Sequence, residues 1–143
     1  QKVIIGLDTP VPLLNQPENH IVDNSVWRQN YRIRDDELSH YLDTPENLWG
    51  TGDRVAYPLI VSGSILIHQS LYLVHVDNLS LYITQYDKRR ASFNYNGLDY
   101  DLAVTDPKFE DFVSGGQESS GILCISLGEV FEGNCYKLVA TIF

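Results

Sequence analysis

The residues between positions 70 and 104 alternate between short apolar runs and residues that favour turns. Runs rich in β-branched and aromatic residues, bounded by turn residues, are typical of antiparallel strands. The Asn96-Gly97 pair favours a tight hairpin turn, because both of its residues tolerate a positive φ. The pattern therefore predicts an antiparallel meander of four strands, at residues 71–76, 79–86, 91–95 and 98–104.

Shorter elements are predicted on both sides of this meander. Asp106 can cap a helix that starts at Pro107 and ends at Gly115-Gly116, because a carboxylate accepts hydrogen bonds from the free N–H groups of a first turn. An earlier helix is predicted from Asp35 or Asp36 to Leu42. Apolar runs predict further strands at residues 2–7, at 59–67 with a bend at Gly63, and at 122–127 and 136–143 as a final hairpin.

The order of these elements predicts the fold class. A meander, one short helix and two further strands is the order of a five-stranded Greek-key barrel of the OB type. We therefore expect a mainly β protein with an OB-like Greek-key barrel and two short helices. Gly50 to Gly52 and Pro58 mark a boundary, so residues 59–143 are expected to form the barrel. A generic small β-barrel or sandwich with the same hairpins is the alternative fold.

The net charge of −9 is spread evenly along the chain. A protein that binds nucleic acid mainly through phosphates usually carries a basic surface, so the charge argues against tight non-specific binding to DNA or RNA. No apolar run approaches the roughly 20 residues needed to span a bilayer, and no membrane association is expected. The sequence has no Met and begins at Gln1 inside an apolar run, so we expect it to be a piece of a longer protein.

Cys124 and Cys135 are the two cysteines. If their strands pair across the loop at residues 129–133, Cys124 lies opposite about Leu138 and Cys135 opposite about Leu127. The two sulfurs would then not face each other, which predicts two free thiols. Free thiols are typical of a reducing compartment, so a cytoplasmic location is expected.

Lys88, Arg89 and Arg90 form the only run of three basic residues, and they fall in the predicted turn after the second strand of the meander. Proteins that bind single-stranded nucleic acid on this fold combine basic groups that contact phosphates with rings that stack on bases. The alternative is a solvated hairpin tip whose charges prevent edge-to-edge association. The candidate nucleic-acid-binding site consists of this basic run and the tyrosines that flank it: Lys88, Arg89, Arg90, Tyr82, Tyr86 and Tyr95.

Two sets of polar residues are candidates for binding a metal ion. Carboxylate oxygens can bind Mg²⁺ or Ca²⁺, although solvent-facing strand positions and a helix cap explain the first set equally well. Imidazole and carboxylate can bind zinc, but the spacing of the second set matches no tight zinc motif. The first set is Asp99, Asp101 and Asp106, and the second is Glu18, His20 and Asp23 completed by His40, His68 or His75.

The remaining motifs are few. The loop segment Gln16-Pro17-Glu18-Asn19 either forms a functional surface or satisfies buried backbone groups between two parts of the chain. The sequence contains no phosphate-binding glycine loop, no GxSxG motif and no CxxC pair. We therefore predict no catalytic residue, no metal and no cofactor.

Five short segments follow one another in a recognisable order along most of the chain: Leu7-Asp8, Gln16-Pro17-Glu18-Asn19, Trp27, Leu48-Trp49 and Thr105-Asp106-Pro107. With these segments the chain resembles the dual OB-containing domain family of prokaryotic proteins. The resemblance implies OB-like units in tandem and a nucleic-acid-binding role beside genome-defence or toxin-like effectors. It also implies that residues 1–58 are the end of a preceding OB-like unit plus a helical linker, with the rest of that unit upstream of Gln1.

The residues and the resemblance together predict a non-catalytic binding module that recognises single-stranded DNA or RNA, or a related nucleotide. The alternative function is a protein-interaction or scaffolding β-barrel, whose acidic surface docks an effector domain or a second copy of the chain. A third class, a hydrolase with acidic catalytic residues, would need a divalent ion. The protein is therefore not predicted to be an enzyme.

Overall fold

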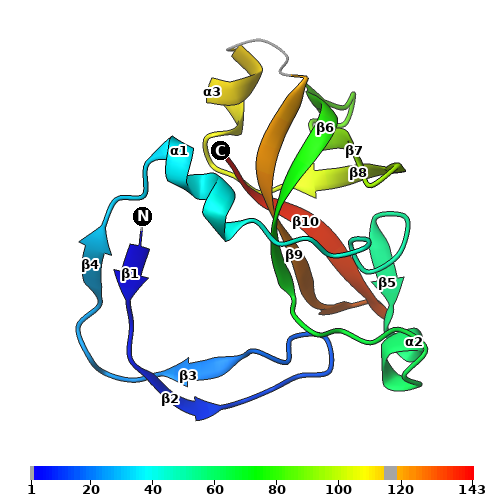
Figure 1. Cartoon of the computed structure of the whole chain (residues 1–143). Helices are drawn as coiled ribbons and strands as arrows, with labels where there is room; N and C mark the ends of the chain where they lie inside the picture. Colours follow the sequence, from blue (N-terminus) through cyan, green and yellow to red (C-terminus); the bar gives the residue numbers. More distant parts are fainter. Residues whose placement is uncertain (1, 115–118) are drawn as a thin grey trace.

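Five strands close into a barrel in the computed structural model, which describes residues 2–114 and 119–143 (Figure 1). They are β6 (Leu71–Ile83), β7 (Arg89–Tyr95), β8 (Leu98–Val104), β9 (Ser120–Phe131) and β10 (Asn134–Ile142). Antiparallel pairs join β8 to β7, β7 to β6, β6 to β9 and β9 to β10, and a parallel pairing of β10 with β8 closes the ring. Helix α3 (Phe109–Ser114) lies between β8 and β9 in the chain. This order confirms the prediction of a mainly β, OB-like fold.

The first barrel strand, β6, is one bent strand where the sequence predicts two. Residues 71–77 pair with β9, and residues 77–83 pair with β7. Asn78 lies at the bend with a φ of 52°, and the register with β7 shifts between Asp77 and Ser80. Asn tolerates this left-handed conformation, so the chain forms a β-bulge here rather than a turn. The predicted break is therefore wrong, and the bulge lets one strand join both sides of the barrel.

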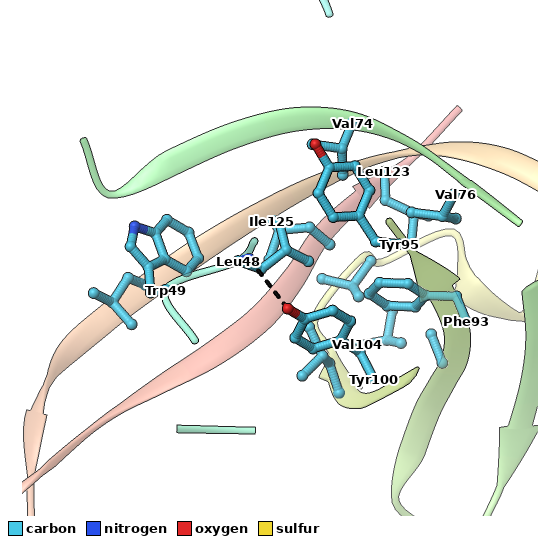
Figure 2. Close-up of a cluster of buried hydrophobic side chains, with 14 of the residues drawn as sticks. Leu48, Trp49, Val74, Val76, Phe93, Tyr95, Tyr100, Val104, Leu123 and Ile125 are labelled. Atoms are coloured by element: carbon cyan, nitrogen blue, oxygen red, sulfur yellow. Dashed lines mark hydrogen bonds between the residues drawn. The ribbon is translucent and has the colours of Figure 1, made fainter. Parts of the chain in front are cut away.

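Inward-facing side chains of the strands fill the core of the barrel (Figure 2). The rings of Phe93 and Tyr100 stack with their centroids 5.6 Å apart. Leu48 and Trp49 are buried with them, and the Leu48 backbone N–H donates to the Tyr100 hydroxyl at 3.2 Å. Strand β5 (Arg54–Ala56) pairs with β10. The segment from residue 48 to residue 56 therefore packs with the barrel, ahead of the boundary expected at residue 58.

Helix α3 packs against the barrel through Phe109, which is fully buried in the core. The helix starts at Phe109 rather than at the predicted Pro107, and Asp106 lies in the turn that leads into it, where one carboxylate oxygen accepts from the Lys108 backbone N–H at 2.8 Å. The other oxygen accepts from the Ile142 backbone N–H at 2.8 Å and so ties the helix start to β10. The helix end predicted at Gly115-Gly116 lies outside the described residues.

Two further short helices precede the barrel. Helix α1 (Asp35–Leu38) continues as a 3₁₀ turn over Ser39–Tyr41, within the range predicted for the first helix. Helix α2 (Tyr57–Val61) replaces the strand predicted at residues 59–67. No helix in the described part of the chain is long and apolar enough to cross a membrane.

The residues that start and end α2 explain why the strand prediction is wrong. Pro58 lies in the first turn, where its missing N–H costs no hydrogen bond. Gly63 follows the helix with a φ of 73°, and glycine in this conformation commonly ends a helix. A short apolar run does not distinguish a strand from a buried helix by its period, so these two residues decide the structure.

Residues 2–31 form an extended arm whose β2–β3 turn reaches the barrel, after which the chain runs outward through β3 and β4 and returns to the barrel at α1 (Figure 1). Strand β1 (Lys2–Ile4) pairs with β4 (Arg28–Tyr31), and β2 (Leu7–Pro10) pairs with β3 (His20–Val22). The single strand predicted at residues 2–7 is thus divided between two ladders. Both ladders are two-stranded and separate from the barrel sheet.

The turn between β2 and β3 attaches the arm to the barrel. Asn15 Nδ2 donates to the Gly128 carbonyl at 3.2 Å, and Gln16 Nε2 donates to the Leu127 carbonyl at 3.3 Å. Glu18 accepts two hydrogen bonds from Ser70. The segment from Gln16 to Asn19 therefore satisfies backbone groups between two parts of the chain, which is one of its two predicted roles.

The final hairpin is longer than predicted, and its register differs. Glu132 and Gly133 form the turn with φ values of 48° and 77°. Cys124 lies opposite Thr141, and Cys135 lies opposite Val130. Both cysteines are free, as predicted.

Candidate nucleic-acid interface

The basic run predicted as a binding site lies where the turn after β6 enters β7. The Thr84 hydroxyl organises this turn by accepting hydrogen bonds from the backbone N–H groups of Tyr86 at 3.3 Å and Lys88 at 3.2 Å. Asp87 has a φ of 58°, a conformation that Asp tolerates. Tyr86 and Lys88 therefore lie in the turn itself, whereas Arg89 and Arg90 begin strand β7.

Arg89 reaches from β7 to helix α3. Its Nη2 lies 2.7 Å from Oε1 of Glu110, and its Nη1 donates to the Asp106 carbonyl at 3.5 Å. The guanidinium carbon lies 5.8 Å from the centroid of the Phe109 ring. Because the Glu110 side chain is 56% exposed, this ion pair contributes little to stability. The Arg89–Glu110 pair is therefore only slightly more stable than the two separate, solvated charges.

Asp101 on β8 holds both Arg90 and Tyr82. Arg90 Nε lies 2.8 Å from the Asp101 carboxylate, and Arg90 Nη2 donates to the Asp101 carbonyl at 2.6 Å. The Tyr82 hydroxyl donates to the second carboxylate oxygen, and this hydrogen bond raises the pKa of the hydroxyl. The Asp101 carboxylate therefore neutralises the Arg90 guanidinium.

The structure separates the three predicted tyrosines. Tyr86 is 76% exposed, and it lies in the turn with Lys88, which forms no ion pair with another described residue. Tyr95 lies at the other end of β7, where it is buried and its hydroxyl donates to the Pro45 carbonyl at 2.7 Å. The alternation that buries Ala91 and Phe93 also turns Tyr95 inward. Tyr95 has no face open to a base, and we leave it out of the site.

Two clefts lie on either side of the start of α3. The first, of about 480 Å³, lies beside the basic turn, and Glu110 and Asp87 contribute acidic groups to it. The second, of about 640 Å³, lies between the β4–α1 segment and the end of β10. Six of the ten Lys and Arg residues of this acidic chain line the two clefts: Lys88, Arg89 and Arg90 in the first, and Arg32, Arg34 and Lys108 in the second.

Sequence reasoning missed the second cleft. Arg32 and Arg34 lie close to acidic residues in the sequence, and Arg34 Nε does pair with Asp36 at 3.1 Å. The available signal was their i, i+2 spacing, which places two side chains on one side of an extended segment. Lys108 lines the same cleft, and this arrangement depends on the tertiary fold, which no local pattern of residues predicts.

The structure does not bring together either set of residues considered for a metal. In the first set, Asp106 accepts from the backbone N–H groups of Lys108 and Ile142, Asp101 binds Arg90, and Asp99 accepts from Asn94 at 2.9 Å. In the second, Glu18 binds Ser70 and Asp23 accepts from the Ser25 backbone. Among residues 2–114 and 119–143, no three His, Cys, Asp or Glu side chains are grouped so that they could hold a metal ion.

A buried lysine outside the predicted site joins β10 to the segment before the barrel. Lys137 is 1% exposed, and its Nζ donates to the carbonyls of Gly50 at 2.7 Å and Thr51 at 3.1 Å. The same Nζ lies 5.2 Å from the centroid of the Tyr100 ring. Burial lowers the pKa of Lys137 to about 8, against the opposing effect of Asp53. These contacts give Lys137 a structural role.

A closed five-stranded barrel with basic clefts beside its helix has the architecture of an OB-type binding module. The sequence matches the family model of the dual OB-containing domain over residues 2–142, and the chain belongs to this family. The match covers the arm as well as the barrel. No curated protein and no solved structure matches the chain. Family and fold together suggest a binding module.

Proposed function

We propose that the chain is a non-catalytic module that binds single-stranded DNA or RNA, or a related nucleotide. The observation that carries the proposal is the gathering of six of the ten basic residues around the start of α3. In a protein with a net charge of −9, such a cluster gives phosphates one attractive region on an otherwise repulsive surface. Lys88, Arg89 and Arg90 contact the phosphates in this proposal.

The exposed ring of Tyr86 supports a single strand as the ligand, because the bases of a duplex already stack on each other. The carboxylates beside the two arginines favour selective binding of the ligand over tight binding. Asp101 and Glu110 neutralise Arg90 and Arg89, so a phosphate must displace them before it gains those contacts. Binding is then weak for a bare phosphate backbone and stronger where a base also stacks.

The test compares wild type with the Arg89→Ala, Arg90→Ala double variant. Labelled dT and rU oligonucleotides of about 15 nucleotides, within the site sizes of OB folds, are titrated by fluorescence anisotropy at several salt concentrations. Loss of two phosphate contacts is expected to weaken binding and to reduce the slope of log K against log salt by roughly 1.4. Circular dichroism checks the fold of each variant.

A matched control is Arg28→Ala with Arg54→Ala, which removes the same charge from outside both clefts. Arg28 and Arg54 line neither cleft, and Arg54 pairs with Asp53 at 2.8 Å. The control is expected to change binding only slightly. Unchanged binding in the cleft variant, or an equal loss in both variants, would remove the basic turn from consideration.

We also propose that the arm is the end of a preceding OB-like unit, within the expected segment 1–58, in a cytoplasmic protein of prokaryotic genome defence. The family description names two OB units, whereas the described residues contain one closed barrel. Two free thiols support a reducing compartment. A structure of the longest natural form of the protein tests this: β1 to β4 should join a second barrel, and an arm that stays apart from any barrel contradicts the proposal.

The arm also supports a second candidate function, the docking of a protein effector domain. Its exposed side chains include many large apolar ones, and exposed apolar side chains gathered in one part of a protein favour an interaction site there. The arm, residues 2–31, carries two basic and three acidic side chains. It is therefore nearly neutral, and its exposed apolar side chains rather than its charge suit it to a protein partner. The exposed apolar residues of the arm are Val3, Ile4, Ile5, Leu7, Val11, Leu13, Leu14, Ile21, Val22, Val26, Trp27 and Tyr31.

The second candidate is tested by co-purification of this chain with the domain fused to it or encoded beside it. The sample is first treated with nuclease, so that a complex that survives is held by protein–protein contacts. Ile4→Asp with Trp27→Asp places charges at two exposed arm positions and is expected to abolish the complex. Retention of the complex by this variant contradicts docking on the arm. A self-associated form that the variant abolishes, seen by mass photometry, would assign the arm to contacts between copies instead.

A further inference from the structure

We infer that the second cleft, between the β4–α1 segment and the end of β10, binds one nucleotide of a single strand, with its phosphate at Arg32 and Lys108 and its base against Phe112. This inference rests on the proposed function and adds a second binding site for the same strand. The volume of about 640 Å³ lies within the range of small-ligand sites, roughly 300 to 1,000 Å³.

The charges of the cleft favour an anion. Arg32 and Lys108 line it, and neither side chain forms an ion pair with another residue in the described ranges. Arg34 also lines the cleft but is partly neutralised by Asp36 and, at 3.9 Å, by Glu37. Two solvated cations facing one cavity attract a phosphate, which the planar guanidinium of an arginine can bind through two hydrogen bonds.

The acidic group in this cleft does not oppose an anion as strongly as its formal charge suggests. Asp106 is 4% exposed. Its two carboxylate oxygens accept from the backbone N–H groups of Lys108 and Ile142, each at 2.8 Å. Both oxygens are therefore directed at the protein backbone, and the cations are the exposed charges of the cleft.

The rest of the lining suits a flat apolar group. Ile33, Leu38, Phe112 and Phe143 contribute apolar surface, and Gln29 contributes an amide that can hydrogen-bond to a base edge. Phe112 packs partly against the core, which fixes the position of its ring. A nucleotide combines the two required features, an anionic phosphate and an aromatic base, and base–aromatic stacking tolerates any base.

The two clefts share one wall, so a single strand can reach both. Val104 and Glu110 line the first cleft, and Asp106 to Lys108 together with Phe112 line the second. Arg89 of the first cleft donates to the carbonyl of Asp106, which lines the second. A strand that crosses the start of α3 therefore contacts the basic turn on one side and Arg32 with Lys108 on the other.

The test uses Arg32→Ala with Lys108→Ala, compared with the Arg89→Ala, Arg90→Ala variant and with the Arg28→Ala, Arg54→Ala control. The same labelled dT and rU oligonucleotides serve as probes. The second-cleft variant is expected to lose about tenfold in affinity and to lower the salt slope by roughly 1.4, through two lost phosphate contacts. Photocrosslinking with 5-bromouridine in the oligonucleotide is expected to label the peptide that contains Phe112 in wild type and to lose that label in the variant.

The outcomes separate this inference from the proposed function. If the second-cleft variant binds like the control and crosslinks map only to the basic turn, the second site is overturned while the proposed function stands. If neither the basic-turn variant nor the second-cleft variant differs from the control, both are overturned. A loss in the second-cleft variant without any crosslink at Phe112 or Phe143 contradicts the assignment of a base to this cleft.

Discussion

Glu18 and Ser70 join the arm to the barrel through one carboxylate oxygen. Oε1 of Glu18 accepts from the Ser70 backbone nitrogen at 2.7 Å and from the Ser70 hydroxyl at 2.6 Å. Burial raises the pKa of Glu18, but the hydrogen bonds from Ser70 outweigh it and leave the pKa below the ordinary 4.5. The attachment of the arm therefore depends in part on the charge of Glu18, beside the neutral hydrogen bonds of Asn15 and Gln16 to the barrel.

Replacement of Glu18 is expected to release the arm. Glu18→Ala removes both hydrogen bonds to Ser70 and should cost about 1 to 3 kcal/mol locally, and Glu18→Gln should cost less because its amide oxygen still accepts. Hydrogen exchange in β2 and β3 should accelerate in that order, with the exposed Glu129→Ala as control. Because the folded pKa is lowered, the stabilisation is present above pH 4.5 and is lost as the pH falls through the folded pKa. Exchange of β2 and β3 that is the same in all variants would contradict this role.

Removal of the competing carboxylate at Asp101 is expected to strengthen oligonucleotide binding. Asp101→Asn keeps the shape of the side chain but frees Arg90 from its ion pair. We expect a gain of about two- to fivefold at low salt that shrinks as ionic strength rises. Asp99→Asn is the control, because Asp99 also lies exposed on β8 but contacts Asn94 rather than a cation. An equal gain in both variants would show that total charge, and not Arg90, is responsible.

Because of the buried Lys137, the stability of the folded protein is expected to rise with pH in the alkaline range. Its folded pKa of about 8 lies below the ordinary 10.5, so the unfolded chain binds more protons between these values and stability rises with pH there. Urea unfolding should show wild type gaining roughly 3 kcal/mol relative to Lys137→Met across this window. Tyrosine and cysteine titrations occur in both proteins and cancel in the difference. Lys88→Met is the control for the loss of one surface charge. If the free energies of unfolding of wild type and Lys137→Met differ by the same amount at every pH, the lowered pKa of Lys137 is contradicted.

The two thiols are expected to react slowly in the folded protein. Burial raises the pKa of Cys124 and of Cys135, and the thiolate is the reactive form. DTNB should label both residues rapidly in denaturant and much more slowly without it, with the fully buried Cys135 slower than Cys124. A mass that shows the loss of two hydrogens under non-reducing conditions would indicate a disulfide and contradict the register of β9 and β10.

Local patterns in the sequence determined most of the barrel. The Asn96-Gly97 turn has the two positive φ values, 49° and 79°, that its composition predicts, and Asp106 accepts from the backbone of the turn that leads into α3. These features depend on a few neighbouring residues and on backbone sterics, so they can be inferred without a tertiary structure. These features predicted a meander, then a helix, then a hairpin. That order of elements in turn predicted the OB-like fold.

Tertiary structure decided the bend of β6 and the composition of the candidate site. A bulge and a turn both need Asn78 in a left-handed conformation, and only the pairing of β6 with two partners distinguishes them. In the same way, the inward face of β7 removed Tyr95 from the site, and Asp101 neutralised Arg90. Arg32 and Lys108 came to line one cleft because the arm returns to the barrel at α1. Such encounters depend on long-range packing, which no local pattern of residues encodes.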